Sequence, residues 1–136
     1  MKRLIVIIGI IVIAGISLIA LNRTQHFNIS DDNITAIVIN TLPESKEHSR
    51  MYRDTEKINK FIAYLNELSL KDTFTENPDK YNGMTSIIGI SYADGRQTIV
   101  YHFGNMFIKE NEGKWKRMTY NEAVKLHELI QDNSSD

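Results

Sequence analysis

The chain has 136 residues, with 16 Lys and Arg, 17 Asp and Glu, and no cysteine, so it fits a single domain of ordinary globular composition. The lack of cysteine excludes disulfides, cysteine-ligated zinc, thiol catalysis and attachment through a lipidated cysteine. After Lys2 and Arg3, 14 basic residues are set against 17 acidic ones, and a mildly acidic domain with interleaved signs lacks the basic surface that nucleic-acid binding needs.

The first predicted element is an apolar run from Leu4 to Leu21, which contains one serine and no charge. A helix of this length spans about 27 Å, close to the ~30 Å hydrocarbon thickness of a bilayer. The run is longer than the apolar part of a cleaved signal peptide, and Leu18 stands where cleavage needs a small residue. We therefore expect residues 1–21 to be a retained transmembrane signal anchor, with cleavage as the alternative. Because Lys2 and Arg3 precede the run, the N-terminus is expected in the cytoplasm and the domain outside it.

Three segments follow the apolar run. Residues 22–33 are polar apart from Phe27 and Ile29, and we expect them to form a short juxtamembrane stalk. Residues 34–41 are β-branched and nearly all apolar, which predicts a strand covered on both faces. Residues 42–53 contain a proline and several charges, and we expect a loop there.

A helix is predicted after Asp54, which is placed to cap it. Its apolar stripe has helical spacing and comprises Ile58, Phe61, Ile62, Leu65 and Leu68. Charged residues occupy the opposite face, where Glu56 and Lys60 are ordered as a favourable i, i+4 pair. The following residues 71–83 are rich in turn formers and are predicted to be a loop.

Short β-type segments then alternate with turn signals. The predicted strands are 85–92, 97–103, 106–109 and 114–118. Asp94 and Gly95 form the pair that tight hairpins prefer, because glycine accepts a positive φ without strain. Turns are also expected at Gly104-Asn105 and at residues 111–113. The region is therefore predicted to be a four-stranded antiparallel meander.

The last predicted helix begins after a capping-box pattern that runs from Thr119 to Glu122. We expect it to run from Tyr120 to Gln131 and to bury Ala123, Val124, Leu126 and Ile130. Residues 132–136 should form a flexible tail. The order β-α-β-β-β-β-α over residues 34–131 predicts an α+β extracytoplasmic domain with a mainly antiparallel sheet, two helices on one face and the other face partly open.

Three stretches carry a resemblance to a known group of proteins. They are the helical run Ile62 to Asn66, the strand and turn Ile88 to Gly95, and the stretch from Tyr101 through Phe103 and Ile108 to Trp115. Together they resemble uncharacterised small domains of Gram-positive bacteria that lie behind N-terminal signal or anchor sequences. The resemblance covers roughly residues 34–131. It implies export and the same topology, and it implies no activity or functional residues.

No pattern in the sequence indicates an enzyme, a metal site or a cofactor. The four histidines fall in separate predicted elements and lack zinc-site spacing: His26, His48, His102 and His127. Ser86 and Ser91 could approach His102 across the sheet, but no Gly-x-Ser-x-Gly elbow is present. The acidic pair Asp31-Asp32 lacks the alternate spacing of a calcium loop. We therefore expect a non-enzymatic protein without metal or cofactor.

The candidate binding surface surrounds the only tryptophan, Trp115. Four cations lie close to it in the sequence: Lys109, Lys114, Lys116 and Arg117. Aromatic residues with cations can recognise a peptide, a glycan or an anionic polymer. The alternative, which we favour at this stage, is that Trp115 packs under a helix while the lysines protect an edge strand from aggregation.

Three functional hypotheses follow from these features. The first is an anchored, non-enzymatic binding, sensor or accessory domain of the bacterial envelope, whose partner is a protein or a cell-wall component. The second is an inhibitor or immunity-type protein that acts at the membrane surface; it predicts an exposed aromatic or loop patch, for instance around residues 42–53. The third is a hydrolase whose catalytic residues have no recognisable motif.

Overall fold

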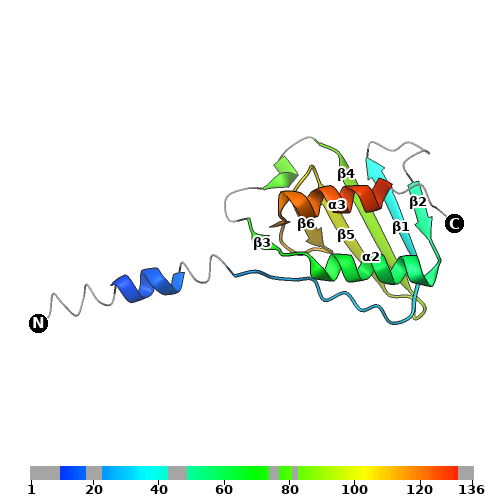
Figure 1. The fold of residues 1–136 in the computed structure, drawn as a ribbon, viewed down its shortest axis with the longest axis horizontal. Helices are drawn as coiled ribbons and strands as arrows, with labels where there is room; N and C mark the ends of the chain where they lie inside the picture. Colours follow the sequence, from blue (N-terminus) through cyan, green and yellow to red (C-terminus); the bar gives the residue numbers. More distant parts are fainter. Residues whose placement is uncertain (1–9, 18–22, 43–48, 74–76, 81–82, 132–136) are drawn as a thin grey trace, which may run out of the picture.

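The computed structural model describes residues 10–17, 23–42, 49–73, 77–80 and 83–131. Residues 10–17 are helical, and the elements of the domain follow them (Figure 1). In chain order these are β1 (Ile34–Leu42), β2 (Ser49–Tyr52), α2 (Thr55–Glu67), β3 (Lys71–Asp72), the short 3₁₀ helix η2 (Pro78–Lys80), β4 (Thr85–Tyr92), β5 (Gln97–Phe103), β6 (Phe107–Glu110), β7 (Lys116–Arg117) and α3 (Tyr120–Gln131).

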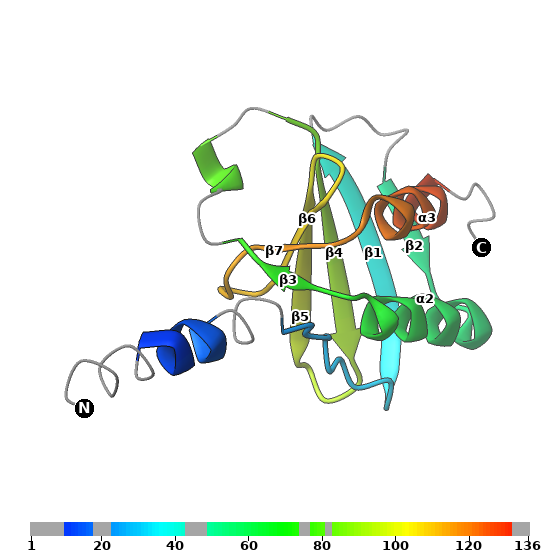
Figure 2. The same ribbon diagram turned by 60° about the vertical axis from the view of Figure 1, so that its left-hand side comes forward.

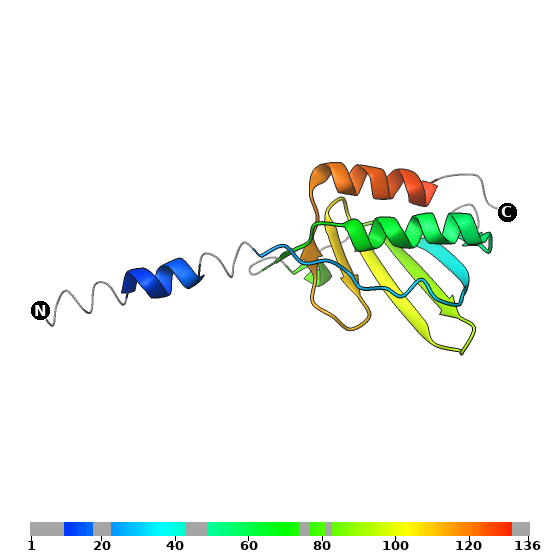
Figure 3. The same cartoon turned by 60° about the horizontal axis from the view of Figure 1, so that its bottom comes forward.

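The strands form one antiparallel sheet in the order β2-β1-β4-β5-β6-β7-β3. Figure 2 shows β7 and β3 lying crosswise to β1 and β4 at one end of this sheet. Both α2 and α3 lie on the same face, as Figures 1 and 3 show. We call this the inner face and the opposite one the outer face. The predicted α+β class, the antiparallel sheet and the placement of both helices on one face are confirmed.

The core lies between the inner face and the two helices. Strand alternation divides β4 between the two faces, so Ile88 and Ile90 point inward and are fully buried, whereas Ile87 is only half-buried. The predicted stripe of α2 supplies the facing side chains, and Ile62 and Leu65 are buried there. Burying apolar area of this kind is the main contribution to the stability of the domain.

Both helices begin with the predicted caps. The Asp54 carboxylate accepts a hydrogen bond from the Lys57 backbone N–H at 2.9 Å. At α3 the capping box is complete: the Glu122 backbone N–H donates to the Thr119 hydroxyl at 3.3 Å, and Glu122 Oε2 accepts from the Thr119 backbone N–H at 2.8 Å. Each cap satisfies backbone donors that have no partner inside the helix.

Glu122 also joins the two helices. Its Oε1 accepts a hydrogen bond from the Ser69 backbone N–H, just after α2, at 2.6 Å. Its backbone carbonyl accepts from the Tyr64 hydroxyl of α2, also at 2.6 Å. Burial raises the pKa of Glu122, but the hydrogen bonds from Thr119 and Ser69 outweigh it and hold the pKa below its ordinary value.

The segment predicted to be a stalk instead packs against the domain. Residues 23–33 run beside α2 (Figure 3), and both Phe27 and Ile29 are buried in the core. The Asn66 side-chain amide bonds both backbone groups of Ile29 at 2.9 Å, accepting from its N–H and donating to its carbonyl. Gln25 and Leu70 exchange backbone hydrogen bonds at 2.8 and 2.9 Å. The domain therefore begins near Gln25 rather than at Ile34.

Two strands lie in regions predicted to be loops. Strand β2 is in the predicted loop 42–53, and β3 is in the predicted loop 71–83. Both are short edge strands that depend on their partners for hydrogen bonds: β2 pairs with the preceding strand β1, and β3 pairs with β7, far along the chain. Their own sequences therefore carry little strand signal. Val124 also differs from its prediction: its side chain is 40% exposed rather than buried.

The predicted transmembrane helix is not seen in the described part of the chain. None of the helices formed by those residues is long and apolar enough to cross a membrane. Of the predicted anchor, the structure describes residues 10–17, which are helical, and the rest of 1–21 lies outside the described residues. The predicted tail, 132–136, also lies outside them.

Candidate functional site

The candidate site is on the outer face of the sheet, and the strand register defines its membership. One row of cross-strand neighbours joins Ile87 of β4, Tyr101 of β5 and Lys109 of β6. The next row joins Phe103 of β5 to Phe107 of β6. Side chains directly opposite each other on one face of an antiparallel pair are close enough to interact. The outer face of the central strands therefore gathers three aromatic rings and a lysine.

Trp115 joins these rows rather than the core between sheet and helices. Its indole lies 6.3 Å from the Phe103 ring, in an edge-to-face arrangement with an interplanar angle of 63°. The Lys109 ammonium lies 4.7 Å from the Trp115 ring centroid and 5.2 Å from that of Tyr101, so the cation sits against two aromatic rings. We call Tyr101, Phe103, Lys109 and Trp115 the aromatic–lysine cluster. The favoured interpretation of Trp115 as a core residue beneath a helix was therefore wrong.

The structure divides the other predicted cations among different positions. Arg117 belongs to the outer face, with its guanidinium 6.0 Å from the Phe107 ring centroid. Lys114 is exposed in the turn before β7. Lys116 pairs with Ile108, which is buried on the inner side, so its register position is on the other face. Of the predicted surface, Trp115, Lys109 and Arg117 lie together.

A second part of the outer face is apolar and reaches the sheet edge. The row that crosses β2, β1, β4 and β5 consists of Met51, Val38, Gly89 and Ile99. Met51 is 44% exposed on the edge strand β2. None of the outer-face positions in these four strands or in β6, all of them within the described residues, is occupied by Asp or Glu. Over the described positions of these five strands, the outer face therefore combines apolar side chains with a cation and lacks acidic groups.

The residues that sequence reasoning missed are Tyr101, Phe103 and Phe107. They are neighbours of Trp115 only because the turn after β5 brings β6 back beside it, and this register is a tertiary property. The usable signal was the alternation of Ile99, Tyr101 and Phe103 along one strand. It placed those three side chains on one face but did not indicate which face the helices would cover.

The geometry does not assemble a hydrolytic site from the serines and histidine considered above. Ser86 and His102 are direct cross-strand partners on the inner face, and both are buried. The Ser86 hydroxyl shares a hydrogen bond with the Thr41 hydroxyl at 3.2 Å, whereas His102 Nε2 has no hydrogen-bond partner. Ser91 pairs with Gln97, five residues along β5 from His102. Within the part of the chain that the structure describes, no three His, Asp or Glu side chains are grouped to hold a metal ion.

Comparison with known proteins adds no further constraint. No protein-family model, no curated protein and no solved structure matches this chain.

Proposed function

We propose that the chain is a non-enzymatic binding domain of the bacterial envelope, held at the membrane by residues 1–21 with the domain on the extracytoplasmic side. Its binding surface is the outer face of the sheet, and its partner is a protein with acidic and apolar surface groups. The observation that carries this proposal is the aromatic–lysine cluster, which lies opposite the helices. Tyrosine, tryptophan and cationic side chains at the centre of an apolar patch are typical of binding hot spots.

Charge and ring geometry support a protein partner over a glycan. The outer face presents Lys109 and Arg117, and none of its described positions in β2, β1, β4, β5 and β6 is acidic, so an acidic partner is complementary to it. A glycan-binding tryptophan usually offers a ring face for stacking. Here the Lys109 ammonium lies over the Trp115 indole, and the Phe103 and Trp115 rings meet in an edge-to-face arrangement. The apolar row ending at Met51 adds area that a protein can bury.

Site-specific photo-crosslinking in the native host tests the surface. A photoreactive phenylalanine analogue replaces Met51 on the outer face or, as the control, Asn59, an exposed residue of α2. We expect a defined protein adduct from position 51 and none of the same mass from position 59. Equal adducts from both positions, an adduct with a second copy of this chain, or a glycan adduct would overturn the proposed partner class.

A matched pair of charge reversals sharpens this test. Lys109 lies against Tyr101 and Trp115 on the sheet, and Lys125 lies 4.9 Å from the Tyr64 ring centroid on the helical side. Lys109→Glu should reduce the position-51 adduct at least about tenfold, because it places a negative charge opposite an acidic partner. Lys125→Glu changes the net charge equally and should leave the adduct unchanged. An adduct that survives Lys109→Glu would count against the outer face.

Topology can be tested separately because the chain has no cysteine. A single cysteine at Asn121, exposed at the start of α3, should react with a membrane-impermeant maleimide on intact cells. A single cysteine at Lys2 should react only after the cells are lysed. The reverse pattern, or equal protection of both positions, would contradict the proposed orientation.

A further inference from the structure

Strand β3 lies at the edge of the sheet where the N-terminal segment joins the domain. Gln25 and Leu70 exchange backbone hydrogen bonds, and the Gln25 side-chain amide donates to Asp72 Oδ2 at 3.0 Å. Figure 2 shows β3 and β7 crossing the end of the sheet that this segment reaches, and the strand order places β3 at the opposite edge from β2. On a chain anchored by residues 1–21, β3 and β7 therefore form the membrane-proximal end of the domain.

Two cations are paired directly across these strands. Lys71 of β3 is the cross-strand partner of Arg117 of β7, and both side chains are exposed. They share the outer face, where the Arg117 guanidinium lies 6.0 Å from the Phe107 ring centroid. Like charges directly opposite each other destabilise an antiparallel pair. The fold therefore keeps a repulsion at this edge that a bound anion would relieve.

The other described charges at this end do not cancel the pair. Asp72 and Lys116 are also cross-strand partners, and their opposite charges offset each other. In the turn before β7, the exposed Glu112 and Lys114 offset each other in the same way. Arg23 is exposed in the adjoining N-terminal segment and adds a cation. We call Arg23, Lys71 and Arg117 the basic edge.

Protection of an edge strand from aggregation is the simplest alternative role for Lys71. That role requires a charge on the edge, but it does not require a second cation directly opposite. The other edge strand, β2, lacks such protection: it exposes Met51 and keeps its single cation, Arg50, half-buried. Edge protection is therefore not a general feature of this sheet, and the pairing of Lys71 with Arg117 has a different explanation.

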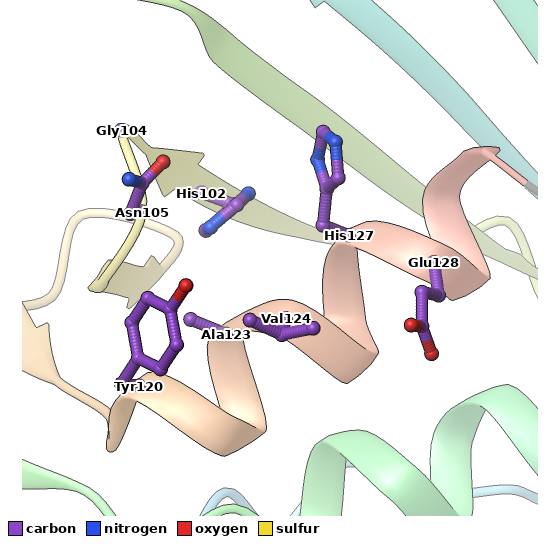
Figure 4. A pocket seen from close by; sticks show the side chains of 8 residues that line it. All are labelled: His102, Gly104, Asn105, Tyr120, Ala123, Val124, His127 and Glu128. Atoms are coloured by element: carbon purple, nitrogen blue, oxygen red, sulfur yellow. The ribbon is translucent and has the colours of Figure 1, made fainter.

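The cleft between the end of β5 and helix α3 offers a second place for a ligand (Figure 4). Its volume is about 280 Å³. Its lining contains no lysine or arginine and includes Glu128, so an anion there would meet a carboxylate rather than a permanent cation. The basic edge is therefore better suited to an anionic partner than this cleft.

We propose that the basic edge seats the domain on the anionic phospholipid headgroups of the membrane that holds its anchor. This inference rests on the anchor in the proposed function, which makes the contact intramolecular. Each cation near an anionic membrane surface favours contact about fivefold, so three cations favour the seated domain over the free one about 100-fold.

Seating the basic edge also sets the orientation of the outer face. Strands β3 and β2 are the two edges of the sheet, so β2 points away from the bilayer when β3 lies on it. The outer face would then stand upright beside the membrane. Lys109 and the apolar row that ends at Met51 stay open to the proposed protein partner.

Quenching of Trp115 measures the seating. It is the only tryptophan, and its backbone carbonyl accepts a hydrogen bond from the Thr73 hydroxyl, just after β3. The full chain is reconstituted in vesicles of phosphatidylcholine, alone or with phosphatidylglycerol, with a quenching nitroxide on some headgroups. We expect at least about twofold more quenching in the anionic vesicles. Sodium chloride at about 0.5 M should remove this excess, because it shortens the Debye length to about 4 Å.

Paired charge reversals locate the contact. Lys71→Glu with Arg117→Glu should lower the ratio of seated to free domain at least about 25-fold and abolish the excess quenching. Lys60→Glu with Lys125→Glu, at exposed positions of α2 and α3, changes the net charge equally and should retain the excess. Each variant is compared with its own emission in vesicles without nitroxide, which removes direct effects of the substitutions on Trp115.

Flotation of the same samples separates this inference from the proposed anchor. A chain that does not float with phosphatidylcholine vesicles has no anchor, and that result would overturn both. A floating chain with equal quenching in neutral and anionic vesicles, an excess that survives salt, or an equal loss in both reversed pairs would overturn the basic edge alone. If the variant at Lys71 and Arg117 does not fold, the lipid and salt comparisons in the unaltered chain still decide it.

Discussion

The two faces of the sheet are made from similar residue types, yet only the inner face forms the hydrophobic core with the helices. Strand β4 places Ile88 and Ile90 inward at 0% exposure, and between them the outer face receives a glycine. Strand β5 places Val100 and His102 inward and Tyr101 and Phe103 outward. Isoleucines occur on both sides, so composition alone does not distinguish core from surface. The difference comes from the two helices, which cover only one face.

The largest expected effect compares adjacent isoleucines on opposite faces. Ile88→Ala removes a fully buried side chain from the inner face and should lower the free energy of unfolding by about 3 kcal/mol. Ile87→Ala, one residue away on the half-buried outer face, should cost about 1 kcal/mol. Urea denaturation at pH 7 measures both. Equal losses would mean that the outer face is as well covered as the inner one.

The inner face should also make stability depend on pH through His102. The pKa of about 4 in the folded state is below the ordinary 6.5, so between these values the unfolded chain binds the extra proton. The contribution of His102 to the free energy of unfolding is therefore fully present above pH 6.5. It falls on acidification, by about 2–3 kcal/mol between pH 7 and pH 4.5.

The control for this pH effect is His102→Gln, which cannot titrate. Carboxyl groups change their charge in both proteins, so the difference between the free energies of unfolding of the two proteins, measured by urea denaturation at each pH, isolates His102. This difference in free energy should narrow steadily from pH 7 to pH 4.5. Parallel curves across this range would show that His102 is not held neutral by burial.

The hydrogen bonds of Glu122, which link α2 and α3, should contribute less to the free energy of unfolding than the buried groups of the inner face. Glu122→Ala removes the acceptor for the Thr119 and Ser69 backbone N–H groups and should cost about 2 kcal/mol at pH 7. Because the folded-state pKa of Glu122 is lowered, this contribution is lost as acid protonates the carboxyl group. Glu128→Ala, an exposed change on the same helix, should stay within about 0.5 kcal/mol. Equal costs for the two variants in urea denaturation would contradict the linking role.

The smallest effect on stability is expected on the outer face, at Gly83. A Cβ atom added there would lie 2.8 Å from Cζ of the Phe103 ring, so Gly83→Ala must displace the end of that side chain. The free energy of unfolding should change by less than about 1 kcal/mol, because the ring end can move. The fluorescence and near-ultraviolet dichroism of Trp115, which contacts Phe103, should change. Unaltered Trp115 spectra would show that the aromatic–lysine cluster is looser than described.

The parts of the fold that could be predicted from sequence are those with local signals. Both helices and their caps at Asp54 and Thr119 follow from apolar spacing and capping chemistry. The hairpin follows from Asp94-Gly95, where Gly95 has a φ of 87°. These features depend on residues a few positions apart, so the chain specifies them without knowledge of tertiary contacts.

The parts that could not be predicted depend on contacts with residues outside the segment itself. Strand β1 lies between β2 and β4, and nothing in residues 49–52 indicates that pairing. The packing of residues 23–33 depends on Asn66 reaching the backbone of Ile29, a contact across 37 positions. The candidate surface was found because Trp115 is the only tryptophan and Lys109 lies close to it in the sequence. Its aromatic neighbours, and the unpartnered nitrogen of His102, required the strand register.

The packed N-terminal segment has a mechanical consequence. Backbone pairing between Gln25 and Leu70 leaves only three residues, 22–24, between the end of the predicted anchor and the first contact of the domain. Three extended residues reach about 10 Å. On a chain held in a bilayer by residues 1–21, the domain would travel laterally with its anchor and could scarcely rise from the lipid surface. It would then meet molecules that share its membrane or lie against it, and remain out of reach of those tens of ångströms above.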